Sequence, residues 1–329
     1  MRPRTTTIRC VLLSVSLAAS VVAWAQPEGY AINTRGDFSD SSQVGALWSI
    51  DLSTGEADLE GRSRISNYLF IEGLAFGPDD RLYGTDDDTN SIVLVGTQSG
   101  NAVPLGGAGQ FENNMGLPAG NHDFGATFTC TGELLVSADS PSLGQVLYQA
   151  DLETGELTLI GSLGIPIVDL ASIGDTVYGI GRGINGDGQT EAPNLYRIDP
   201  ETADNVLVGG LGDAAGTYNK AGLAVDADGV LWGVLERRDP RNPAVSIASR
   251  IVRIDPASGA AEAVSDAWVA GTGEPLVGIE SLAIAPPGQC QGAPVFEPVE
   301  VPSASLPARL VLLILLAALG VVHLGRLQG

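Results

Sequence analysis

The chain has 329 residues, of which 44% are hydrophobic and 17% are charged, so it can build a substantial core and is not a disordered polymer. Its 43 glycines, 19 prolines and aromatic content of only 5% are typical of short strands joined by turns, and favour one all-β domain. With 39 Asp and Glu against 17 Lys and Arg, the formal charge of -22 would repel a phosphate backbone, which excludes nucleic acid as a partner.

Residues 1–25 have the layout of a secretory signal peptide. Three arginines precede an apolar run over residues 11–22, and Ala23-Trp24-Ala25 forms a small-x-small cleavage site before Gln26. We therefore expect an exported protein whose mature chain starts at Gln26. The alternative is an uncleaved anchor, for which the apolar run is short.

A two-part phrase repeats along the middle of the chain. The first part begins as GLAFGPDDRLYG at Gly73 and returns from Gly125, Asp169, Gly222 and, truncated, Glu280. The second part begins as LWSIDLSTGEADLEG at Leu47 and has four further copies, among them LYRIDPETADNVLVGG. Each part reads as a hairpin, because apolar stretches flank a turn rich in Asp, Gly or Thr. The repeat spacing of about 44 to 59 residues is typical of propeller blades.

Two hairpins make a four-stranded sheet, and such sheets bury their faces by stacking around an axis as a β-propeller. Residues 30–34 resemble a second strand whose first strand is missing, and residues 280–285 supply a first strand with no partner after it. We therefore expect five four-stranded blades, with the C-terminal strand closing the first blade. Six blades are the alternative, if residues 107–120 or 237–249 contain further strands.

The phrase LYxIDPxTGxxxLVG…GLAxxPDGxLYG, over most of residues 30–287, resembles the repeats of secreted bacterial propellers related to the NHL and gluconolactonase-like superfamily. The resemblance implies the fold and not one chemistry, since propellers host enzymes, sugar binders and interaction surfaces alike. Several aromatic residues recur at repeat positions and are expected to pack between blades: Trp48, Tyr83, Tyr148, Tyr178, Tyr196 and Trp232.

Acidic residues recur just before the innermost strands. Glu72 and Glu280 hold the same repeat position, and Asp169, Asp123 and His122 lie close to it in other copies. Equivalent positions of a ring converge near its axis, so we expect these residues at the channel mouth as candidate metal or ligand residues. The resemblance implies a divalent metal at Glu72, because gluconolactonase-like propellers use a Glu of a Glu-Gly pair in this way. The alternative is that these side chains only solvate the loop rim.

Residues 184–191, with the sequence INGDGQTE, resemble a calcium loop in which oxygen ligands alternate around a Gly turn. The candidate ligands are Asn185, Asp187 and Glu191. Gly183 stands where such a loop has its first carboxylate, so an ordinary turn is the alternative. Calcium is the candidate cofactor both of this loop and of the channel mouth, and the sequence does not identify another.

Cys130 and Cys290 remain in the mature chain, and an even number of cysteines in an exported protein predicts a disulfide. Both follow an innermost strand and so lie at the same end of the ring, although two separate thiols are the alternative. The sequence has no CxxC motif and no Cys/His cluster, which excludes a structural zinc site and a c-type haem.

The C-terminus has the pattern of a sorting tail. A Pro-rich linker over residues 291–305 contains Val301-Pro302-Ser303-Ala304-Ser305 and precedes an apolar helix over residues 306–329, in which Arg326 marks the cytoplasmic side. This pattern is similar to the IPTL and PEP sorting tails of Gram-negative bacteria, although Pro307 replaces the usual Trp. The similarity implies insertion in the inner membrane and a sorting protease of the exosortase kind as a partner.

All acidic residues lie between residues 26 and 300, and Lys220 is the single lysine of the chain, which suits an exported protein kept soluble by self-repulsion. We expect a propeller over residues 26–290, at the periplasmic side of the inner membrane or at the cell surface after tail processing. It is expected to be a non-catalytic scaffold for a protein or glycan partner. The alternative is a metal-dependent, lactonase-like hydrolase with Glu72 and Glu280 as ligands and His122 or Asp123 as base. Neither a GxSxG elbow nor a P-loop motif is present.

Overall fold

The computed structural model describes residues 27–34, 44–60, 68–106, 113–120 and 122–285, and the regular elements within these ranges are all β-strands. By its internal contacts the chain divides into the units Met1–Gln291 and Gly292–Gly329, and the described residues all belong to the first. Within them, no helix is long and apolar enough to cross a membrane. The signal peptide, Cys290, the linker, the sorting motif and the C-terminal helix lie outside the described residues and stay predictions.

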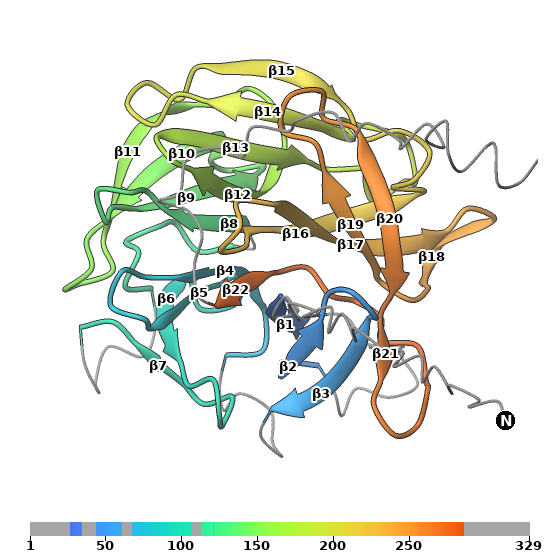
Figure 1. Ribbon diagram of the computed structural model, residues 1–329. Coiled ribbons are helices and arrows are strands. Elements are labelled where there is room, and N and C mark those ends of the chain that lie inside the picture. The colour runs from blue at the N-terminus through green and yellow to red at the C-terminus, as the bar shows by residue number, and fades with distance from the viewer. Residues whose placement is uncertain (1–26, 35–43, 61–67, 107–112, 121, 286–329) are drawn as a thin grey trace, which may run out of the picture. The chain divides into compact units, whose positions relative to one another are not determined.

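Four blades are built in simple chain order, with the first strand innermost (Figure 1). The second blade contains β4 (Ile71–Phe76), β5 (Leu82–Asp86), β6 (Ser91–Val95) and β7 (Ala102–Pro104). The third contains β8 (Asp123–Phe128), β9 (Leu134–Ser140), β10 (Gly144–Ala150) and β11 (Leu157–Ser162). The fourth contains β12 (Ile167–Ile173), β13 (Thr176–Gly181), β14 (Asn194–Ile198) and β15 (Asn205–Gly210). The fifth contains β16 (Tyr218–Val225), β17 (Leu231–Asp239), β19 (Arg250–Ile254) and β20 (Ala261–Asp266).

The first blade joins the two ends of the described chain. Its strands are, from the axis outwards, β22 (Ala283–Ala285), β1 (Glu28–Asn33), β2 (Ala46–Asp51), β3 (Glu56–Glu60) and β21 (Trp268–Val269). β22 pairs antiparallel with β1, with Ala283 opposite Tyr30, and β21 pairs parallel with β3. Five blades with closure by the C-terminal strand are therefore confirmed. The region 237–249 adds β18 (Asn242–Ser246), which pairs with β17 and extends the fifth blade without forming a sixth.

The repeated turn of the second hairpin has a local cause. In four of the five blades an Asp side chain at or directly after the end of a strand accepts a hydrogen bond from the backbone N–H two residues later, at 2.8 to 3.0 Å, and Gly96 holds this position in the second blade. This Asx geometry reverses the chain with no help from the rest of the fold. The residues concerned are Asp51, Asp151, Asp199 and Asp255.

Apolar packing between blades supplies the core. The described residues contain five buried apolar clusters, and each combines side chains of two neighbouring blades. Trp48 of the first blade and Trp232 of the fifth share one cluster, and Tyr83 of the second blade packs edge-on against Phe128 of the third at 5.0 Å. The recurring aromatic residues therefore pack between blades, as the repeat predicted, and each blade depends on its neighbours to bury its faces.

The innermost strands approach one another closely at one repeat position. That position is occupied by Gly73, Gly125, Asp169, Gly222 and Ser281 in the second, third, fourth, fifth and first blades. A Cβ on Gly125 would lie 2.4 Å from the Asp169 Cα, and a Cβ on Gly222 would lie 2.3 Å from the Ser281 carbonyl carbon. Only glycine fits at these approaches. Where the position is polar, the side chain bonds to the backbone, as when Ser281 Oγ accepts the Ile32 N–H at 3.1 Å.

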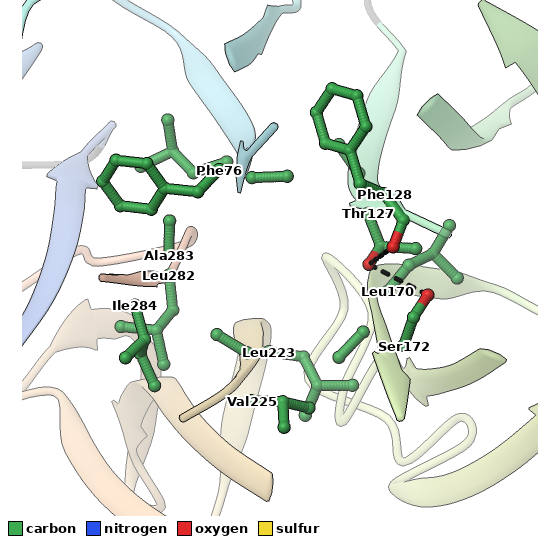
Figure 2. Close-up of a pocket in the computed structure, with 15 residues that line it drawn as sticks. Phe76, Thr127, Phe128, Leu170, Ser172, Leu223, Val225, Leu282, Ala283 and Ile284 are labelled. Atoms are coloured by element: carbon green, nitrogen blue, oxygen red, sulfur yellow. Dashed lines mark hydrogen bonds between the residues drawn. The ribbon is translucent and has the colours of Figure 1, made fainter. Parts of the chain in front are cut away.

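Beyond this position the channel becomes narrow and mostly apolar. Three consecutive residues from each blade enclose a cavity of about 30 Å³, with Leu74, Ala126, Leu170, Leu223 and Leu282 beginning the five triplets. Figure 2 shows these side chains around the channel, with Thr127 Oγ1 bonded to Ser172 Oγ at 3.3 Å. A volume of this size holds one or two water molecules. A ligand larger than water therefore has to bind outside this part of the channel.

The close backbone contact at Gly222 predicts the effect of adding a single methyl group there. Gly222→Ala should lower the free energy of unfolding by about 1–3 kcal/mol, because the backbone of the closing segment leaves no room for the Cβ. Gly186→Ala is the matched control, since a Cβ there meets nothing within 4 Å. Urea unfolding of both variants checks the prediction, and equal stability of the two would contradict it.

Candidate functional site at the channel mouth

One lysine and three carboxylates meet where the innermost strands begin. Lys220 Nζ donates a hydrogen bond to Glu72 Oε1 and lies 2.7 Å from Asp123 Oδ1 and 3.4 Å from Glu280 Oε2. The lysine belongs to the fifth blade, and the three acids belong to the second, third and first blades. The lysine side chain is only 8% exposed. We call these four residues the mouth cluster.

Two β-bulges direct the side chains of the mouth cluster. The register of β4 against β5 shifts between Ile71 and Gly73, and the register of β16 against β17 shifts between Tyr218 and Ala221. A bulge adds a residue to one strand and changes the direction of its side chain. Glu72 and Lys220 are residues of these two bulges, which brings them into the channel from blades that are not neighbours.

A second cation extends the mouth cluster sideways. The Arg182 guanidinium follows β13 in the fourth blade, and it pairs with Asp123 Oδ2, with Asp139 Oδ2 at 2.8 Å and with Glu191 Oε2 at 3.6 Å. Asp123 therefore bridges the two cations, and through them all five blades are connected. Beside Arg182 lies a cavity of about 620 Å³ whose wall includes Asp123, Asp139, Glu191 and Tyr196.

Burial changes the pKa of one carboxyl of the mouth cluster, that of Glu72. Loss of water around Glu72 raises its pKa to about 7, an effect that Lys220 opposes and that Glu280 and Asp87 reinforce. The other oxygen of Glu72, Oε2, accepts the Phe124 N–H at 3.0 Å, which joins the second blade to the third. Glu280 Oε2 accepts a hydrogen bond from the Thr34 hydroxyl at 2.5 Å. Glu72 thus joins two blades, whereas the bond of Glu280 to Thr34 lies within the first blade.

Asp169 lies away from the mouth cluster and has a different role. Its Oδ1 accepts the N–H groups of Ala126 at 3.0 Å and Leu170 at 2.9 Å, and its Oδ2 accepts the Leu223 N–H at 2.7 Å. These donors belong to β8, β12 and β16, so one side chain joins three innermost strands. Burial raises the pKa of Asp169 well above its usual value, while the three N–H donors oppose that shift. Its oxygens serve the backbone and do not face the mouth.

His122 is buried next to the mouth cluster. Its backbone N–H donates to Asp87 Oδ1 at 2.5 Å, and its Nε2 lies 2.9 Å from the Pro118 carbonyl oxygen, which assigns the ring proton to Nε2. The ring packs edge-on against Phe124 at 5.8 Å. Burial also raises the pKa of Asp87. The described contacts of His122 are thus to a loop carbonyl and an aromatic ring, and they include none of the mouth carboxylates.

The candidate calcium loop folds as a tight turn. Asn185 Oδ1 accepts the N–H groups of Asp187 at 3.0 Å and Gln189 at 2.9 Å, and Glu191 pairs with Arg182. The three candidate ligands therefore do not converge on one point. Among the residues that the structure describes, no group of three or more His, Cys, Asp or Glu side chains is arranged to hold a metal ion.

Cys130 lies on the turn after β8, where its Sγ donates to the Gly174 carbonyl oxygen of the fourth blade at 3.3 Å. Cys290 lies outside the described residues, so the disulfide stays a prediction.

Sequence reasoning missed Lys220, Arg182 and Asp139 as members of the site. For Lys220 a signal existed, because the only lysine of the chain stands two residues before Gly222, at the start of an innermost strand.

The chain matches no protein-family model and no curated protein sequence. Among solved structures it is similar to a gluconolactonase from Xanthomonas campestris, at 15% identity over 68% of this chain and 76% of that chain, with a TM-score of 0.38. It is also similar to the calcium-binding protein regucalcin from Agrobacterium tumefaciens, at 15% identity over 68% of each chain, with a TM-score of 0.40. A chain of a nidogen/laminin complex matches at 14% identity over 80% of this chain and 99% of that chain, with a TM-score of 0.45.

These likenesses are too remote to support a functional argument. The fold follows from the strand order itself. The chain is a five-bladed β-propeller.

The contacts of Asp169 predict that Asp169→Asn destabilises the ring. The amide keeps one acceptor oxygen but turns an NH₂ group towards a backbone N–H, which leaves that donor unsatisfied and costs about 1–3 kcal/mol. Asp175→Asn, an exposed change in the same blade, is the control. Urea unfolding gives the free energy of unfolding of both variants. A loss no larger for Asp169→Asn than for Asp175→Asn would show that Asp169 does not hold the three innermost strands together.

The raised pKa of Glu72 predicts a pH dependence of stability. Between its ordinary value of 4.5 and about 7, the folded state keeps a proton that the unfolded state has released. The free energy of unfolding contributed by this group is therefore fully present below pH 4.5 and decreases as the pH rises to about 7. We expect the free energy of unfolding of Glu72→Gln to decrease less with pH over this range, because glutamine does not titrate. The charged and titratable groups that face this position remain in the variant: Lys220, Glu280, Asp87 and Asp123. Urea unfolding across this pH range tests it, and parallel curves for the two proteins would be the contrary result.

Proposed function

We propose that this chain is an exported, non-catalytic β-propeller that binds a protein or glycan partner through the loops around its channel mouth. The observation that carries the proposal is the use of the mouth carboxylates. Both oxygens of Glu72 are engaged, one by Lys220 and one by the Phe124 N–H, and both oxygens of Asp123 are engaged by Lys220 and Arg182. Groups that a hydrolase would use as ligand and base are thus consumed in holding the blades together.

The charge of the mouth favours a partner of complementary sign. Five carboxylates, on Glu72, Asp123, Asp139, Glu191 and Glu280, face the two cations Lys220 and Arg182. The remaining negative charge adds to that of an acidic chain, so a basic peptide or an amino-bearing glycan is the partner chemistry that we propose. Such binding should weaken as salt screens the exposed charges.

The proposed location rests on the two termini. The signal-peptide pattern of residues 1–25 supports export, and the sorting pattern from Val301 onwards supports a tether in the inner membrane or release to the cell surface. A sorting protease that removes the tail is part of this proposal. So is the disulfide between Cys130 and Cys290, which an oxidising compartment favours.

A second candidate is a metal-dependent hydrolase of the lactonase type. One observation favours it, namely that Glu72, Asp123 and Glu280 all contact one point, which the Lys220 ammonium occupies. For a metal to occupy that point, Lys220 would first have to leave it. We therefore rank this function below the binding scaffold.

A substrate screen separates the two functions. The full-length protein, assayed on small lactones and esters with and without calcium chloride, is expected to give no hydrolysis above that of Glu72→Gln. Asp228→Asn, an exposed acid on a turn after an innermost strand, serves as the surface control. Calcium-dependent hydrolysis that persists in Asp228→Asn and disappears in Glu72→Gln would overturn the scaffold and establish the hydrolase.

A further inference from the structure

The Lys220 ammonium occupies the point at which a metal ion would be expected in such a ring of acids. Carboxylate and hydroxyl oxygens are the ligands that calcium takes, at about 2.3–2.6 Å. Glu72 Oε1, Asp123 Oδ1 and Glu280 Oε2 offer this chemistry, and the Thr34 hydroxyl is bonded to the last of them. With the ammonium among these oxygens, a metal ion does not fit.

We infer that Lys220 is a tethered cation that replaces a divalent metal ion at the channel mouth, and that removal of its ammonium leaves a site for one calcium ion. The inference goes beyond the proposed function, because it concerns how the mouth is held together whatever the loops bind. It makes the propeller independent of metal. It also assigns the single lysine of an acidic chain to one structural position.

Geometry supports this assignment more strongly than charge alone. The side chain of Lys220 reaches from the fifth blade to acids on the first, second and third blades, and the acidic side chains of Glu72 and Glu280 are 6% and 1% exposed. A lysine that served only as a solvent-exposed charge would not need to reach across the channel in this way. A carboxylate this deeply buried needs a partner charge, because an isolated one is strongly disfavoured away from water.

Loss of the ammonium has two possible compensations. The carboxylates take up protons, or they take up another cation. Asp123 keeps its pair with Arg182, so Glu72 and Glu280 are left with two negative charges, more than one added proton neutralises. A divalent ion neutralises both of these charges and coordinates several oxygens at once. The space released by truncating the lysine stem lies among those oxygens.

Lys220→Ala tests the inference directly. The full-length protein is purified in detergent, dialysed against EDTA and then titrated with calcium chloride, with bound ions counted by native mass spectrometry. We expect the variant to bind one more calcium ion than the wild type, and calcium to raise its thermal unfolding midpoint. Lys220→Arg, which keeps a cation, is the matched control and should bind no more calcium than the wild type. The double variant Lys220→Ala, Glu72→Gln should lose the added ion.

Three results would overturn the inference. A calcium ion that binds the wild type and is lost in Glu72→Gln would show that the lysine does not replace the metal. A folded Lys220→Ala protein that gains no calcium ion would show that the oxygens do not form a site. If the alanine variant folds neither with EDTA nor with calcium, Lys220→Gln takes its place, because glutamine keeps part of the stem and adds an amide oxygen. A glutamine variant that folds and binds no added calcium ion again contradicts the site. Calcium-dependent hydrolysis that persists in Glu72→Gln would overturn only the proposed function, whereas hydrolysis lost in Glu72→Gln would overturn both.

Discussion

The ion contacts of Lys220 connect parts of the ring that the strands alone do not connect. Neighbouring blades are held by apolar clusters and by hydrogen bonds between innermost strands, whereas in the described part of the chain the ion pairs that join blades on opposite sides of the channel come from side chains that reach the axis. Lys220 provides two such contacts, to Glu72 and Asp123, and a third to Glu280 of the neighbouring first blade, while Arg182 adds the fourth blade through Asp123. A buried ion pair of this kind contributes little net stability but strongly disfavours arrangements in which one partner is absent.

The approach of the innermost strands explains which side chains reach the axis. Glycine at three of the five equivalent positions lets the strands come into close contact, and Asp169 and Ser281 at the other two supply acceptors for backbone N–H groups. With the wall closed at this level, Lys220 and its three carboxylate partners lie before it, where the innermost strands begin. The repeat thus separates a packed, apolar part of the channel from a polar part, within a few residues of each strand.

The sequence predicted the fold because its signal is local and repeated. Each turn carries its own Asp or Gly, and each strand its own apolar residues, so five weak copies reinforced one another. Glu72 and Glu280 could be placed near the axis from repeat register alone. Lys220 stands at the repeat position of Asp123, two residues before a glycine, but a cation there gives no pattern that recurs in the other copies. Arg182 enters from a loop after β13, where repeat register gives no guide. The contacts of Asp169 could not be predicted either, because the sequence does not distinguish an acid that binds a ligand from one that accepts hydrogen bonds from backbone N–H groups.

The composition of the first blade bears on the order in which the chain folds. Its inner hydrogen bonds join residues 249 positions apart, such as Ile32 and Ser281, and β21 and β22 both come from the last part of the described chain. Contacts over such a separation form slowly, because a long loop must close before they contribute. Blades two to five can each form from contiguous chain, whereas strands β1 to β3 have no axial neighbour until β22 has been placed. Ring closure is therefore expected to be the late, rate-limiting step of folding.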